Sequence, residues 1–285
     1  MCSGIPRSFF LRSSWHPCVT SNLRNFAKRT QYAQVGLSSG TSVQCLPGST
    51  LVLVALWLGL FLLLTLLVHT RFLAPLDEAG LSAIAALRPT SMEQAVGWIF
   101  RLGFAQVDAA VAVVWAAALL ILRRSLLAAL PPLVLFAGIG AQAGLRLIVD
   151  QPSPTSSYAY YRPFASQPVG YALDRADTVA RETFVAAVAP EATTSRNPGT
   201  FPSGHALRSL FLALLAAEML RRSTRWRARL GYRLPLAILI FLVVLVGYSA
   251  MFYGYHWPSD ILGGYLLALA LYHLASIPQS LAPDL

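Results

Sequence analysis

The chain has 285 residues, of which 56 % are hydrophobic and 12 % are charged, and its mean hydropathy is +0.57. A soluble domain is usually about half apolar and about a quarter charged, so these values exclude an ordinary soluble protein and predict a membrane protein. The formal net charge is +10, but no basic face with base-reading or stacking residues accompanies it. This argues against nucleic acid as a partner.

Residues 1–47 come first along the chain and contain no acidic residue. Their many serines and arginines predict a disordered, basic cytoplasmic tail. Two alternatives remain open for this segment, an organelle-targeting peptide and an over-extended gene start. The three cysteines (Cys2, Cys18 and Cys45) have no metal-site spacing, so we interpret them as free thiols.

Apolar runs of about 20 residues, the length that crosses a bilayer as a helix, recur after the tail. They predict that residues 48–280 form an all-α, polytopic membrane domain, a bundle of six transmembrane helices. The predicted spans are 50–69, 105–122, 126–148, 204–220, 234–252 and 259–277. The semi-polar segment 77–100 predicts one or two short helices at the membrane interface, with Trp98 among the headgroups. Gln142 and His205 lie within predicted spans, and we expect them to face the bundle interior.

The basic residues are distributed unevenly between the two sides of the predicted bundle. Six arginines lie in segment 221–233, and Arg123 and Arg124 occupy another short loop. With six spans, these loops and the basic tail fall on one side, while most acidic residues fall on the other. The positive-inside rule then places both termini in the cytoplasm and the longest loop, 149–203, outside.

The sequence Pro202-Ser203-Gly204-His205 opens the fourth predicted span. We expect Pro202 in the first helical turn, with the backbone N–H groups of Ser203 and Gly204 pointing outward. A helix N-terminus binds anions through such donors, and a histidine beside it can protonate a leaving oxygen. Ordinary turn chemistry and a structural histidine are the alternatives at this point.

A second polar motif, SAMFYGYHWPSDILGG, joins the last two predicted spans. Pro258 is expected early in a helix, which puts Asp260 in the first turn, within reach of His256. A carboxylate that fixes one imidazole nitrogen leaves the other more nucleophilic. The alternative is that Asp260 only stabilises the helix start.

The predicted topology brings these two motifs to the same outer membrane level. Two imidazoles, a carboxylate, a hydroxyl and a helix N-terminus would then surround one anionic centre. Arg146 ends the third span on that side, where its planar guanidinium can bind phosphate oxygens or serve as an interfacial anchor.

These residues resemble the motifs of the type 2 phosphatidic acid phosphatase superfamily, which includes vanadium haloperoxidases and lipid phosphotransferases. The family pattern is Lys-x6-Arg-Pro, then Pro-Ser-Gly-His, then Ser-Arg-x5-His-x3-Asp. The matching segments begin at Arg146, Pro202 and Ser249. The resemblance implies a six-span bundle with its active site at the outer membrane interface, and it implies no metal or other cofactor.

The resemblance also implies a role for each matched residue. His256 would be the nucleophile that forms a phosphohistidine, Asp260 would orient it, and His205 would be the general acid. The phosphate would be bound by Arg146, Ser203 and Gly204.

The chain departs from the family pattern at two positions where an arginine is expected. Ser153 and Ala250 stand there instead. Each lost charge-assisted hydrogen bond typically costs about 1.5–3 kcal/mol, so phosphate binding needs other cations. Arg208, one turn along the helix from His205, and Arg162, in the outer loop, are the candidate substitutes.

We therefore predict a membrane-bound, metal-independent phosphatase of lipid phosphates or lipid pyrophosphates, located in the inner or plasma membrane. Polyprenyl diphosphate, phosphatidic acid and phosphatidylglycerol phosphate all remain possible substrates. Transfer of a lipid headgroup is one alternative, because a phosphodiester carries less charge and needs fewer cations. A non-catalytic family member with a degenerate site is the other.

Overall fold

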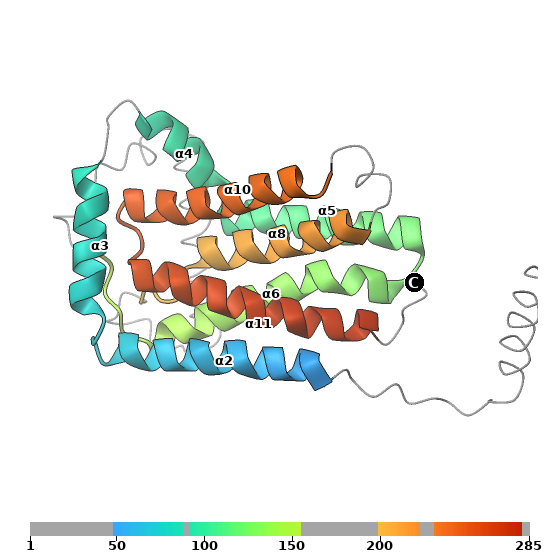
Figure 1. Ribbon diagram of the computed structural model, residues 1–285, viewed down its shortest axis with the longest axis horizontal. Coiled ribbons are helices and arrows are strands. Elements are labelled where there is room, and N and C mark those ends of the chain that lie inside the picture. Colours follow the sequence, from blue (N-terminus) through green and yellow to red (C-terminus); the bar gives the residue numbers. More distant parts are fainter. Residues whose placement is uncertain (1–47, 88–91, 155–198, 223–230, 281–285) are drawn as a thin grey trace, which may run out of the picture. The chain divides into compact units, whose positions relative to one another are not determined.

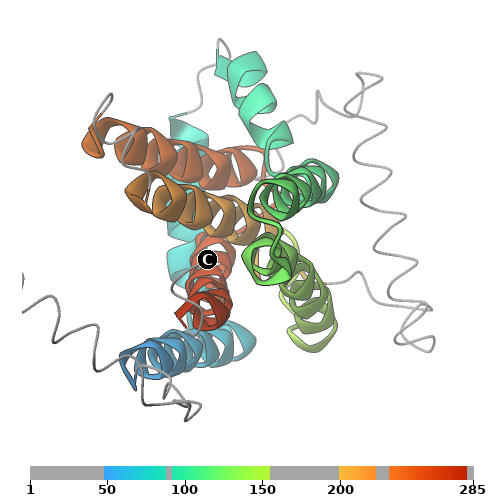
Figure 2. The same ribbon diagram turned by 90° about the vertical axis from the view of Figure 1, so that its right-hand side faces the viewer.

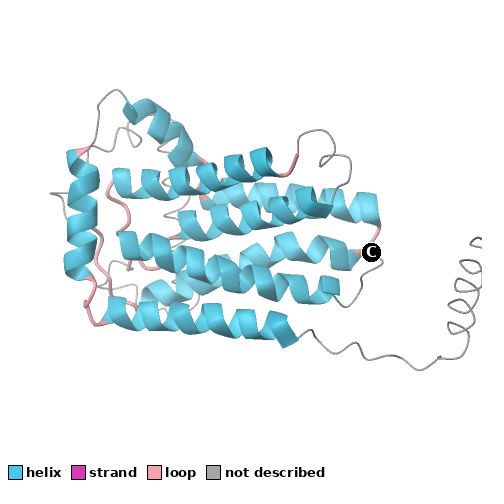
Figure 3. Cartoon of the chain, viewed as in Figure 1, coloured by secondary structure: helices cyan, strands magenta, loops and turns pink. Residues whose placement is uncertain are grey.

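The computed structural model describes residues 48–87, 92–154, 199–222 and 231–280, and the elements in these ranges are helices (Figure 3). The predicted tail 1–47 and Arg162 lie outside the described residues. In chain order, the helices are α2 (Gly48–His69), α3 (Ala74–Ala86), α4 (Glu93–Arg101), α5 (Ala105–Arg123), α6 (Leu126–Ile148), α8 (Gly204–Arg222), α10 (Arg233–Phe252) and α11 (Pro258–Ser280). The described part of the chain is therefore all-α, as predicted.

The six long helices run alongside one another, as Figure 1 shows. Helices α8 and α11 pack together at the centre, and the end-on view in Figure 2 shows the others arranged around them. Helix α8 contacts α5, α6 and α10 as well, while α11 contacts α2 and α6. This arrangement puts the beginnings of α8 and α11 at the same end of the bundle.

Five of the long helices are long and apolar enough to cross a membrane, namely α2, α5, α6, α10 and α11. Their outward faces carry large apolar side chains, among which Leu63, Val114 and Phe241 are exposed by 54 %, 69 % and 62 %. An apolar surface of this extent needs a nonaqueous surrounding. The observation agrees with a domain whose outer surface faces lipid.

Helix α8 differs from the other long helices because it is polar at several positions. It carries Arg208, Glu218, Arg221 and Arg222, and it is not among the helices apolar enough to count as a candidate span. Its packing explains the difference: four helices surround it, and the side chains of residues 204–208 are all buried. A helix enclosed by protein does not need a lipid-compatible surface.

The semi-polar segment 77–100 contributes to two short helices, which agrees with the prediction. Helix α3 lies across one end of the bundle and contacts α10 and α11 (Figure 1). Helix α4 packs against α10, and its Trp98 is 61 % exposed with the Arg101 guanidinium over its ring. The end of the bundle that α3 crosses is the end that holds the candidate site.

Candidate active site

The turn between α10 and α11 positions His256 and Asp260. Helix α11 begins at Pro258, so Asp260 lies in its first turn, as the sequence predicts. The carboxylate oxygen Oδ2 lies 3.2 Å from Nδ1 of His256 and accepts a 2.9 Å hydrogen bond from the backbone N–H of Trp257. Both side chains are buried, and Asp260 is fully so. The carboxylate therefore holds the imidazole by one nitrogen, which leaves Nε2 to face another group.

The start of α8 differs in detail from the expectation. The helix begins at Gly204, so Pro202 precedes the first turn. The side-chain oxygen of Ser203 accepts a 3.4 Å hydrogen bond from the backbone of Ala206, which makes Ser203 the N-cap. The backbone N–H of Ser203 donates to the carbonyl of Asp260 at 2.9 Å. The expectation of an outward-pointing Ser203 N–H was wrong, because that donor joins α8 to α11.

The general-acid candidate His205 lies among aromatic rings. Its imidazole stacks on Phe100, with ring centroids 4.5 Å apart and an interplanar angle of 16°. Phe104, the residue before α5, also contacts the imidazole in an edge arrangement, with ring centroids 5.8 Å apart. The centroids of His205 and His256 are 6.0 Å apart. The two imidazoles thus lie close enough to act on the two sides of one small group.

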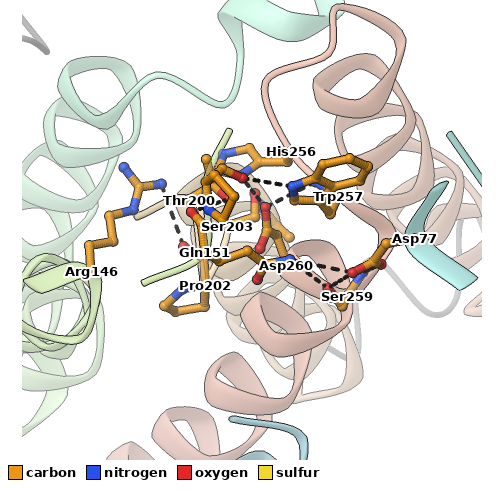
Figure 4. A network of polar contacts seen from close by, with 12 residues as sticks. Asp77, Arg146, Gln151, Thr200, Pro202, Ser203, His256, Trp257, Ser259 and Asp260 are labelled. Carbon is orange, nitrogen blue, oxygen red and sulfur yellow. Dashed lines mark hydrogen bonds and ion pairs between the residues drawn. The ribbon is translucent and has the colours of Figure 1, made fainter. Parts of the chain in front are cut away.

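Arg146, at the end of α6, points toward the same place. Its guanidinium Nη2 lies 3.5 Å from the carbonyl of Pro202, and Figure 4 shows it on the far side of this segment from Asp77. The side chain is partly buried, and its charge interacts with Asp260. The three motif segments that are far apart in sequence are therefore adjacent in space.

Arg208 lies beside the start of α8 with its guanidinium already engaged. It forms a 3.0 Å ion pair with Asp108 and donates to Gln142 at 3.1 Å and to the carbonyl of Gly103 at 2.6 Å. A methyl group on Gly204 would collide with this guanidinium and with the amide of Gln142. Glycine at position 204 thus avoids a clash with two buried side chains that are hydrogen-bonded to each other. Arg208 remains a predicted substitute for a missing family arginine, although the carboxylate of Asp108 balances its charge.

The two positions that lack the family arginine differ in their surroundings. Ala250 is completely buried in an apolar cluster that includes Phe104, Ala206 and Tyr253. Ser153 is exposed in the segment after α6. The hydrophobic residues that pack around Ala250 supply no cation in place of the missing arginine.

A further carboxylate, which the sequence did not single out, connects these segments. Asp77 of α3 is 5 % exposed and accepts hydrogen bonds from Ser259 and Gln151 (Figure 4). Burial raises the pKa of Asp77, and the nearby Asp260 carboxyl acts in the same direction, whereas the donors lower it. The available signal was that Asp77 is the first acidic residue after the first span, and this does not by itself indicate a partner.

The fold agrees with the comparisons to known proteins. Residues 133–279, more than half of the chain, match the family model of the PAP2 superfamily. The chain belongs to this superfamily of phosphatidic acid phosphatase type 2 proteins. Together with the five helices that are long and apolar enough to cross a bilayer, this membership makes the chain an integral membrane protein.

Two individual proteins are similar to the chain. An undecaprenyl-diphosphatase of Sulfolobus acidocaldarius is 34 % identical over 84 residues, which cover 30 % of this chain and 35 % of that protein. The chain therefore matches only about a third of that relative's length. The crystal structure of a transmembrane PAP2-type phosphatidylglycerolphosphate phosphatase from Bacillus subtilis superimposes with a TM-score of 0.58 and 20 % identity, covering 79 % of this chain and 94 % of that chain. The similarity to this crystal structure shows that the two proteins share a fold.

Proposed function

We propose that the protein is a phosphatase of lipid phosphates or lipid diphosphates that works through a phosphohistidine. The observation that carries the proposal is the cluster of His205, His256 and Asp260 at one end of the bundle, with the imidazole centroids 6.0 Å apart. Membership of the PAP2 superfamily supports the same chemistry. The names of the two relatives, an undecaprenyl-diphosphatase and a phosphatidylglycerolphosphate phosphatase, support the substrate class.

The proposed reaction has two steps. Nε2 of His256 attacks phosphorus, the bond from phosphorus to the leaving oxygen breaks, and His205 gives that oxygen a proton. Water then attacks phosphorus and gives a proton to His205 while the phosphorus–nitrogen bond breaks, which releases inorganic phosphate and restores both histidines. Asp260 stabilises the imidazole through its contact with Nδ1.

In this proposal, the phosphate lies at the start of α8. The hydroxyl of Ser203, the backbone N–H of Gly204 and the guanidinium of Arg146 bind its oxygens, helped by the positive end of the helix. Arg208 and Arg162 remain the candidates for the additional positive charge.

The proposed membrane arrangement has six spans, in which α5, α6, α10 and α11 surround α8. The basic loops then lie in the cytoplasm together with both termini, and the site faces outward. The lipid tail would enter sideways between helices. Membrane lipids and the lipid substrate are the proposed partners, and the cell's inner or plasma membrane is the proposed location.

The test is phosphate release by the purified protein in detergent, from a panel of lipid monophosphates and diphosphates. We expect release by the wild type that falls to background in His256→Ala. His273→Ala is the matched control, because His273 is a partly buried histidine of the same helix α11, several turns from the site. Its activity should equal that of the wild type.

Two other outcomes would contradict the proposal. Loss of lipid substrate with no free phosphate would indicate headgroup transfer, which the missing arginines at positions 153 and 250 make the second candidate. Equal, low turnover by the wild type and by His256→Ala on every substrate would indicate a non-catalytic protein.

A further inference from the structure

The first turn of α11 needs an external partner for its backbone. The residue before the helix, Trp257, has an indole side chain that only donates, so it cannot accept a hydrogen bond from the helix N-terminus. The indole N–H instead donates to the carbonyl of Pro152 at 2.8 Å. The usual N-cap function, in which a side-chain oxygen accepts from the second or third helical N–H, is therefore not available at Trp257.

Asp77 supplies this function from α3. Its Oδ1 accepts the backbone N–H of Ser259, the second residue of α11, at 2.9 Å, and its Oδ2 accepts the Ser259 hydroxyl at 2.6 Å. Ser259 directly precedes Asp260. A carboxylate 182 residues away in sequence thus caps the helix turn that carries Asp260.

The same carboxylate also holds the segment that follows Arg146. The side-chain amide of Gln151 donates to Oδ2 of Asp77 at 3.3 Å and to the hydroxyl of Ser259 at 3.2 Å. The backbone carbonyl of Gln151 accepts the N–H of Thr200 at 3.0 Å, three residues before Ser203. Figure 4 shows this chain of contacts running from α3 through Ser259 and Gln151 toward the start of α8.

From this geometry we infer that Asp77 is a positioning residue, which fixes the first turn of α11 and so holds Asp260 against His256. As a statement about catalysis, this inference rests on the proposed function. Asp77 precedes the family match at residues 133–279, so the role belongs to the part of this chain outside that match. A carboxylate–imidazole pair displaced by about 1 Å can lose activity by about a hundredfold.

The test compares substitutions of Asp77 with a neighbouring control. We expect Asp77→Ala to lower kcat by about tenfold to a hundredfold, because the nucleophile loses its orientation. KM should rise by a smaller factor, because Asp77 reaches the start of α8 only through Gln151 and Thr200. Asp77→Asn should restore most of kcat. Its carbonyl still accepts the N–H of Ser259, and the Gln151 amide can rotate to present its oxygen. Glu78→Ala removes an exposed carboxylate of the same helix and should change neither constant.

A second measurement does not depend on catalysis. Hydrogen exchange followed by mass spectrometry should show faster exchange at the start of α11 in Asp77→Ala, and wild-type exchange in Asp77→Asn and in Glu78→Ala. Ser259→Ala, which removes only the hydroxyl, should show milder forms of both effects, and it replaces Asp77→Ala if that variant does not fold.

The outcomes separate the inference from the proposed function. Unchanged exchange, unchanged kcat per folded molecule, or a rise in KM alone would each overturn the positioning role. A wild type that releases no phosphate would overturn the proposed function. The exchange data would still decide whether Asp77 holds the turn of Asp260 and His256.

Discussion

At the scale of single residues, the charge of Arg208 in the bundle interior needs a partner. Arg208 is 4 % exposed and Asp108, its 3.0 Å partner on α5, is also 4 % exposed. A buried unpaired charge is strongly unfavourable, and lipid around the bundle offers it no compensation. We interpret the pair as the feature that lets α8 carry an arginine one turn from His205.

Removing one partner of this pair should destabilise the protein more than removing both. We expect Asp108→Leu to cost about 3–5 kcal/mol, because it leaves the guanidinium buried without its counter-charge. The double variant with Arg208→Met should lose less than Asp108→Leu alone, and so less than the sum of the two single variants. Thermal unfolding in detergent measures both, and additive losses would show that the ion pair has no role in stability.

At the scale of helices, the site depends on how closely α8 and α11 approach each other. Gly264 lies one turn beyond Asp260 on α11, where a methyl group would collide with the carbonyl of Ser203 and lie 2.9 Å from the side chain of Ala206. Backbone atoms cannot move aside as a flexible side chain can. Gly264 thus permits the contact that joins the two catalytic segments.

Gly264→Ala should therefore separate the two helix starts and lower both stability and activity. We expect a loss of about 1–3 kcal/mol, typical of an overpacked core site, and a fall of at least about tenfold in kcat. Gly140→Ala is the control, since a methyl group there meets nothing within 4 Å. If the two variants have the same melting temperature and the same kcat, then close packing at Gly264 is not what positions the site.

At the scale of the whole molecule, the sequence predicts the helices better than it predicts their contacts. Apolar run lengths predict all six long helices, because a bilayer requires about 20 apolar residues for each span. The four-residue spacing of His256 and Asp260 predicts their contact, since Pro258 starts a helix between them. The helices and the contact between His256 and Asp260 both depend on residues that are close together in the sequence.

The features that the sequence did not predict depend on long-range packing. Nothing near Asp77 indicates Ser259, which lies 182 residues away. The Ser203 N–H was expected to point outward, but the close approach of α11 provides a carbonyl for it. Asp108 was a usable signal, because an acidic residue inside an apolar run indicates that a polar partner is buried next to it. Only the fold shows that this partner is Arg208.

The central claim is that His256 forms a covalent bond to phosphorus, and the most direct measurement is a rapid quench of the wild type during turnover of a lipid phosphate. The quench must be alkaline, because phosphohistidine is stable there, and peptide mass spectrometry then locates the phosphate. The account predicts phosphate on the peptide that contains His256, at Nε2, and no such adduct in His256→Ala. Turnover with no adduct, or with phosphate on a different residue, would contradict it.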